Sequence, residues 1–238
     1  MKGRAIMKQL RGLISLLAVA FFAAATTARA TTNLTAGATI SLATVIDNNL
    51  DVQIGDKNFT NFFFSYIDTD LNPNDDLTRS NLTLTALSNG FGFGVSFQQP
   101  LLALGTATNN IVFKYAVAVT DPNFKISDIH LSITGSAGNG GLGTVGEDAF
   151  VGGFGGTNVG HLDASIPGLS TDADNIVPTV TQLWVQKNVM VTGGGAANGF
   201  ASITIIDQTF SQVPEPSTMM LVGLGLLGVV AVRRKRKL

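Results

Sequence analysis

The sequence predicts an all-β protein whose central part is an antiparallel β-sandwich, with a jelly-roll as the expected variant. Apolar and small or polar residues alternate along short runs, as in Phe91, Phe93, Val95 and Phe97, and this period of two is typical of strands with one buried face. Asn, Asp, Gly and Pro, which favour turns, separate the runs. A β-helix is the alternative, but no repeat of fixed length supports it.

Eight strand-like runs follow one another along the chain, and together they predict two packed sheets. They cover residues 38–46, 59–67, 80–87, 91–97, 113–119, 129–133, 179–191 and 199–210. Between them, residues 135–160 hold 11 glycines, and we predict a mobile or multiply turned loop there. Gly141 to Gly146 matches G-x-G-x-x-G, but a dinucleotide site needs a buried parallel strand before the motif and a helix after it.

The N-terminal 30 residues have the pattern of a secretory signal peptide. Four basic residues precede the apolar stretch Leu13 to Ala25, and Ala28-Arg29-Ala30 fits the small-x-small cleavage rule. The stretch is shorter than a membrane span, which argues against a retained anchor. We therefore expect residues 1–30 to be removed and the mature chain to begin at Thr31.

Charge is distributed unevenly along the chain. Residues 31–216 hold five basic residues against all 16 acidic ones, a net charge of −11. This charge disfavours nucleic acid, which is bound by Lys and Arg contacts to phosphate. The chain has no cysteine, so disulfides, thiolate metal sites and Cys nucleophiles are excluded.

The C-terminal segment combines an apolar run with a basic end. Met219 to Val232 gives 14 apolar or glycine residues, about 21 Å of helix against a hydrocarbon core of about 30 Å. We expect a short transmembrane helix that the bilayer accommodates by thinning. By the positive-inside rule the basic cluster stays in the cytoplasm and the acidic domain lies outside. This cluster consists of Arg233, Arg234, Lys235, Arg236 and Lys237.

The motif before that helix, Val213-Pro214-Glu215-Pro216, completes a three-part signal with the helix and the basic cluster. Residues 213–238 thus resemble the PEP-CTERM sorting signal of exported proteins in Gram-negative bacteria that make extracellular polysaccharide. The resemblance implies recognition by an exosortase-type enzyme, transient anchoring in the inner membrane, and delivery to the cell envelope, surface or extracellular matrix. It implies nothing about the activity of residues 31–212, which we predict to be the exported domain.

An acidic run between two predicted strands could bind calcium. Oxygen-bearing side chains stand at alternate positions: Asp68, Asp70, Asn72, Asn74 and Asp76. Calcium takes six to eight oxygen ligands, and such a run supplies several. Pro73 and Arg79 depart from the EF-hand pattern, so further ligands would be needed. A solvated hairpin loop with Asx turns is the alternative.

No motif indicates an enzyme. The chain has two histidines, His130 and His161, and neither H-E-x-x-H nor G-x-S-x-G. We therefore expect a non-enzymatic structural or interaction protein, associated with exopolysaccharide and without a cofactor unless calcium binds. A calcium-dependent carbohydrate-binding module is the alternative. Few exposed aromatic rings are expected to support it, since Trp184, Tyr66 and Tyr115 are the Trp and Tyr residues of the chain.

Overall fold

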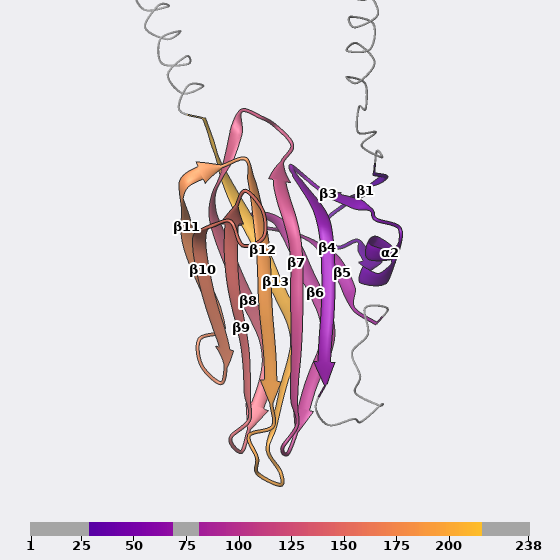
Figure 1. Ribbon diagram of the computed structural model, residues 1–238, viewed down its shortest axis with the longest axis vertical. Helices are drawn as coiled ribbons and strands as arrows, with labels where there is room; N and C mark the ends of the chain where they lie inside the picture. The colour runs from indigo at the N-terminus through magenta and orange to yellow at the C-terminus, as the bar shows by residue number, and fades with distance from the viewer. Residues whose placement is uncertain (1–28, 69–80, 216–238) are drawn as a thin grey trace, which may run out of the picture.

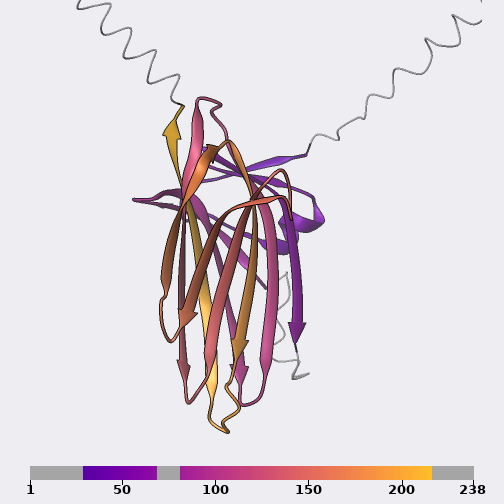
Figure 2. The same cartoon turned by 60° about the vertical axis from the view of Figure 1, so that its left-hand side comes forward.

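The computed structural model describes residues 29–68 and 81–215. These ranges contain thirteen strands and one short helix. The strands form two sheets that pack face to face, as Figures 1 and 2 show from two directions. The prediction of a mainly antiparallel β-sandwich is confirmed. The first strand and the end of the last strand lie at the same end of the sandwich (Figures 1 and 2).

One sheet has seven strands in the order β1-β3-β4-β7-β12-β9-β10. β1 pairs with β3 in parallel, and the other pairs are antiparallel. In chain order its strands are β1 (Thr31–Leu34), β3 (Asp51–Ile54), β4 (Lys57–Asp68), β7 (Thr108–Val119), β9 (Leu142–Val151), β10 (Thr157–Ile166) and β12 (Gln182–Thr192).

The second sheet has six antiparallel strands in the order β11-β8-β13-β6-β5-β2. Its strands are β2 (Thr39–Ser41), β5 (Thr83–Asn89), β6 (Gly92–Leu104), β8 (Phe124–Gly138), β11 (Thr171–Val180) and β13 (Phe200–Pro214).

The last eight strands interleave between the two sheets. β6-β13-β8-β11 are neighbours in one sheet and β7-β12-β9-β10 in the other. Apart from the β9–β10 hairpin, each step along the chain from β6 to β13 crosses from one sheet to the other. This is the strand order of a jelly roll, with two Greek keys wound on each other.

The core between the sheets is built by alternation along each strand. In β12, for example, Leu183, Val185, Val189 and Val191 are buried. Aromatic rings fill the middle, where Phe97 from one sheet stacks on Phe113 from the other with ring centroids 4.9 Å apart. A domain of this size can be held by such a core without disulfides, because it buries most of the apolar surface of its unfolded chain.

The glycine-rich segment is not a loop, and that prediction was wrong. Residues 135–160 form the end of β8, all of β9 and the start of β10. The buried positions of β9 alternate, but Gly143 and Glu147 occupy two of them, in turn with Val145 and Ala149. Burial along β9 therefore has a period of two, but the hydrophobicity of its residues does not show that period.

The first predicted strand, residues 38–46, is also partly wrong. Only Thr39–Ser41 is a strand, and α2 (Leu42–Asp47) follows it. The Ser41 side chain caps this helix by accepting a hydrogen bond from the Thr44 N–H at 3.1 Å, which satisfies one of the free N–H groups of the first turn. Figure 1 shows α2 beside the sandwich near β4 and β5.

Three sequence predictions fall wholly or mostly outside the described residues. They are the signal peptide, the membrane helix with its basic cluster, and the calcium loop, of which Asp68 alone has a described backbone, at the end of β4. Within residues 29–68 and 81–215, no helix has the length and apolar character needed to cross a bilayer. The three predictions remain predictions from sequence.

Candidate functional site: a groove on the outer face of the six-stranded sheet

A groove of about 680 Å³ lies over β8, β11 and β13, next to the turn between β5 and β6. On β8 the core-facing residues Ile129, Leu131 and Ile133 are buried, so His130 and Ser132 point to the opposite face. The groove therefore lies on the outer face of the six-stranded sheet. Its volume is in the usual range for small-molecule sites, about 300–1,000 Å³.

The aromatic part of the groove is Phe91, which stacks on His130 with ring centroids 4.4 Å apart. Phe91 is 57% exposed. Its backbone is fixed on both sides: its N–H donates to Asn89 Oδ1 at 2.9 Å, and its carbonyl accepts from the Ser211 hydroxyl at 2.6 Å. His130 is held in turn by Asp128 at 2.9 Å from Nε2. The exposed ring is thus positioned before any ligand arrives.

The remaining walls combine apolar residues with polar ones, and two of the polar ones are carboxylates. The apolar residues are Leu131, Leu169 and Ala173, and the polar ones are Asn89, Ser132, Thr171, Asp172, Asp207 and Thr209. Asp207 Oδ1 is buried and has no hydrogen-bond partner among the described residues. The described lining holds no Lys or Arg. The groove therefore suits a ligand that donates hydrogen bonds, and it disfavours an anion.

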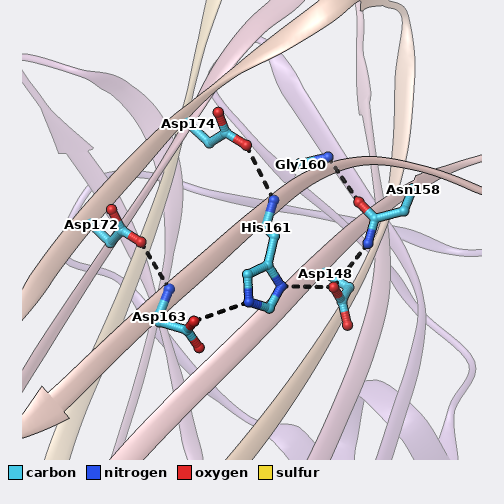
Figure 3. Close-up of polar contacts among 7 residues, drawn as sticks. All are labelled: Asp148, Asn158, Gly160, His161, Asp163, Asp172 and Asp174. Atoms are coloured by element: carbon cyan, nitrogen blue, oxygen red, sulfur yellow. Dashed lines mark hydrogen bonds and ion pairs between the residues drawn. The ribbon is translucent and has the colours of Figure 1, made fainter.

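Beside the groove, His161 lies between two carboxylates on the seven-stranded sheet. Nδ1 is 2.8 Å from Asp148 Oδ1, and Nε2 is 3.0 Å from Asp163 Oδ2 (Figure 3). Asn158 orients Asp148 through a hydrogen bond of 2.9 Å. The hydrogen bond to Asp148 is the main reason that the pKa of His161 is raised, and Asp163 adds to it. Both ring nitrogens are occupied, so neither is free to act as a general base.

The edge strands β10 and β11 are joined across the two sheets by carboxylates. Asp172 accepts a hydrogen bond from the Asp163 N–H at 2.8 Å, and Asp174 accepts one from the His161 N–H at 3.2 Å (Figure 3). Edge strands expose unpaired N–H groups that invite association with other chains. These two carboxylates satisfy two such groups, and Asp172 links this edge to the groove.

The sorting motif begins within the last strand. Val213 and Pro214 are paired with β8 in β13, and Glu215 forms an ion pair with Lys125 at 3.2 Å. Pro214 is compatible with this pairing because it stands at the final position of β13, where a missing N–H is tolerated. Pro216 lies outside the described residues.

The groove was not predictable from the sequence because the residues that line it are distant from one another in the chain. Phe91 was expected in an alternating strand, but it lies in the turn just before β6, where its ring is exposed. The turn signal Asn89-Gly90 was available in the sequence. Nothing in the sequence alone indicated that Phe91 would stack on His130. Among the described residues, no group of three or more His, Cys, Asp or Glu side chains is arranged to hold a metal ion.

Solved structures similar to this chain include tailspike protein 4 of bacteriophage CBA120 (15% identity, 61% of this chain, 19% of that chain, TM-score 0.27). Accessory secretory proteins 1, 2 and 3 of Streptococcus pneumoniae match at 12% identity over 58% of this chain and 92% of that chain, with a TM-score of 0.29. CsCBM6-3 of Clostridium stercorarium, in complex with cellobiose, matches at 14% identity over 62% and 93%, with a TM-score of 0.24. Such low scores carry no argument about this chain.

The comparison with protein-family models gives a more specific result than these structures do. No curated protein matches the chain, but the model of the PEP-CTERM protein-sorting motif matches residues 212–236. This range contains the Pro214-Glu215-Pro216 motif, the apolar run and all but one residue of the basic cluster. The motif implies export, membrane-associated sorting and processing by an exosortase-type enzyme. The chain is therefore a PEP-CTERM domain-containing protein, with a β-sandwich placed before its sorting signal.

Proposed function

We propose that this chain is a non-enzymatic protein of the cell envelope or extracellular matrix, and that its β-sandwich binds a neutral, hydroxyl-rich polysaccharide in the outer groove. The observation that carries the proposal is the exposed Phe91 ring, fixed over His130 and surrounded by hydroxyl, amide and carboxylate groups. Sugars present apolar ring faces and many hydroxyls, so they need this combination of an aromatic surface and polar partners.

Charge supports a neutral glycan over an acidic one. The described groove lining includes Asp172 and Asp207 and no cation, and residues 31–216 carry a net charge of −11. An anionic polysaccharide would be repelled both at the groove and at longer range. A neutral polysaccharide can instead donate hydrogen bonds from its hydroxyl groups to these carboxylates.

The contacts around the groove support a binding role over a catalytic one. Asp172 accepts backbone N–H groups with both oxygens, from Asp163 and from Ala173. His130 is engaged by Asp128, and His161 by two carboxylates. A hydrolytic site needs an acid and a base that can exchange protons with substrate and water. Here Asp172, His130 and His161 already have structural partners, and Asp207 is the one remaining carboxylate of the described groove lining, where hydrolysis needs a pair.

The location follows from the tail. We propose that the chain crosses the inner membrane and is held there briefly by Met219 to Val232, with the basic cluster in the cytoplasm. An exosortase-type enzyme then processes it near Pro214-Glu215-Pro216. The sandwich is thereby delivered to the envelope, surface or matrix, where polysaccharide is available.

The proposal is tested by binding of the purified full chain, in detergent, to an array of neutral and acidic polysaccharides, with and without a calcium chelator. We expect saturable binding to neutral glycans and weaker binding to acidic ones. Failure to bind any neutral glycan would overturn the proposal. If the chelator abolishes binding, the calcium-dependent alternative is favoured, with the ligands predicted between Asp68 and Asp76.

A further inference from the structure

A cluster of polar side chains is buried between the two sheets of the sandwich. We name it the core triad: Lys187 on β12, Glu147 on β9 and Gln208 on β13, each with 0% of its side chain exposed. Lys187 and Glu147 stand opposite each other in the seven-stranded sheet, whereas Gln208 comes from the other sheet. The Lys187 amine contacts both Glu147 Oε2 and Gln208 Oε1. The Lys187 amine thus connects side chains from three strands and from both sheets.

As a structural ion pair the core triad is incomplete. Glu147 Oε1 and Gln208 Nε2 are buried without a hydrogen-bond partner among the described residues, and so is the hydroxyl of Tyr115. A buried polar network with unpaired members is less stable than apolar packing of the same volume. Unpaired buried groups in a native fold therefore call for a role other than stability through hydrogen bonding.

Burial shifts the two ionisable members of the core triad toward their uncharged forms. Burial lowers the pKa of the Lys187 amine, and the Glu147 carboxylate only partly opposes this effect. Burial likewise raises the pKa of Glu147, with Lys187 opposing. A neutral amine has a lone pair and can act as a nucleophile, and a protonated carboxyl can supply a proton. The carboxamide of Gln208 lies in contact with this amine.

We propose that Lys187 and Gln208 form an intramolecular isopeptide bond, with Glu147 carrying the proton. Nζ of Lys187 attacks Cδ of Gln208 and forms the new C–N bond. The protonated carboxyl of Glu147 gives its proton to the carboxamide nitrogen and takes one proton from Nζ. The Cδ–Nε2 bond then breaks and ammonia leaves. No oxidant, reductant or cofactor is needed, since an amine and a primary amide give a secondary amide and ammonia.

The geometry explains why Gln208 is assigned as the acyl group and Glu147 as the acid. Gln208 Nε2, the leaving nitrogen, is not held by a hydrogen bond to any described residue. Reaction with Gln208 joins the two sheets of the sandwich, whereas reaction with Glu147 would join strands that are already paired. The chain has no cysteine, so this bond would be a covalent link of a kind that survives outside the cytoplasm without disulfides.

Peptide mapping of the full chain tests the proposal. A protease that cleaves before aspartate cuts before Asp174 and Asp207, which puts Lys187 and Gln208 on different peptides. We expect these two peptides to remain joined, with a mass equal to their sum minus one ammonia, and fragment ions to place the link at Lys187 and Gln208. Two separate peptides at full mass, recovered from folded protein, would overturn the proposal.

Three variants define the chemistry. Glu147→Gln keeps the shape of the side chain and removes the acid, so we expect separate peptides from a protein whose far-ultraviolet circular dichroism is unchanged. Gln208→Ala should also prevent the link, whereas Gln212→Ala, on the same strand, should leave it intact. A linked product in Glu147→Gln would refute the role of Glu147. Loss of one water, with the link between Lys187 and Glu147, would refute Gln208 as the acyl group.

A second lysine provides an internal comparison. Lys57 contacts Gln212 Oε1 at 2.9 Å and Asp56 Oδ1 at 2.6 Å, but Asp56 is 32% exposed. Burial lowers the pKa of the Lys57 amine as well, but water reaches the Asp56 carboxylate, so the buried acid that carries the proton in the core triad is missing there. We expect no link at Lys57, and a link there would contradict the requirement for complete burial.

Discussion

His161 is held between Asp148 and Asp163 on the surface of β10, and its raised pKa makes its contribution depend on pH. The pKa of His161 in the folded protein lies above the ordinary value of 6.5 for a histidine. The stabilisation is therefore fully present below the unfolded pKa and is lost as the pH rises through the folded pKa. Because the side chain is 56% exposed, solvent screens the pairs and limits their effect.

We predict that His161→Gln lowers the free energy of unfolding by about 0.2–1 kcal/mol at about pH 5, the range of exposed ion pairs, and by less at about pH 8.5. Urea denaturation of the wild type and the variant at both pH values measures this difference. An equal loss at the two pH values would show that the contribution does not depend on the charge of the imidazole.

Tyr115 is fully buried, and its hydroxyl has no hydrogen-bond partner in the described part of the chain. A buried polar group without a partner costs about 1–3 kcal/mol. We therefore predict that Tyr115→Phe unfolds at the same or a higher urea concentration than the wild type. Tyr115→Ala, which also removes the ring, should lose about 3–5 kcal/mol. A clear loss of stability in Tyr115→Phe would mean that the hydroxyl is satisfied.

At the scale of single residues, the sequence predicted which side chains are buried better than it predicted which side chains contact each other. Val95 and Phe97 were expected on the buried face of a strand and are there, whereas Phe91 was expected with them and is exposed. The contact between Phe91 and His130, and the meeting of Lys187 with Gln208, depend on how the two sheets align. Such contacts join distant positions, and no local pattern encodes them.

The β5–β6 hairpin shows how a strand position can require glycine for space. A Cβ on Gly94 would lie 1.7 Å from the backbone oxygen of Gln208 in β13, whereas a Cβ on Gly90 would have nothing within 4 Å. We predict that Gly94→Ala destabilises the protein by about 1–3 kcal/mol or more, because the backbone of a packed sheet must move. Gly90→Ala is the matched control and should have almost no effect. Similar urea midpoints for the two variants would contradict the close approach of β6 and β13.

At the scale of elements, strands were predictable where inward positions are apolar. β7 and β12 have this pattern and were expected, although β12 began later than predicted. β9 was missed because Gly143 and Glu147 point inward in it. Glycine there allows the sheets to approach, and Glu147 belongs to the core triad. The residues that made the sequence look like a loop are thus the ones with special roles in the fold.

For the whole molecule, the sorting motif decides where the sandwich goes. We predict that changing Pro214, Glu215 and Pro216 to alanine leaves the protein in the inner membrane at precursor length, because the processing enzyme no longer recognises the tail. Cell fractionation with immunoblotting measures both location and length. The control changes Ser217 and Thr218 to alanine, which keeps the motif. Normal release of the first variant would refute its role in sorting.

In the function that we propose, the tail delivers the sandwich to a polysaccharide-rich surface and the groove binds neutral glycan there. The fold positions the groove by pairing β8 with both β11 and β13, and the tail follows β13 directly. The net charge of −11 over residues 31–216 disfavours binding of nucleic acid and anionic polymers. These features are consistent with one role, in which a compact domain recognises neutral glycan after export.

The most direct test of this account compares Phe91→Ala with Phe63→Ala for binding to the neutral polysaccharide that the wild type binds best. Both rings are exposed, but Phe63 lies on the other sheet, outside the groove. Affinity electrophoresis should show at least about a tenfold loss for Phe91→Ala, equivalent to about 1.4 kcal/mol, and wild-type binding for Phe63→Ala. Unchanged binding by folded Phe91→Ala would contradict the assignment of the groove.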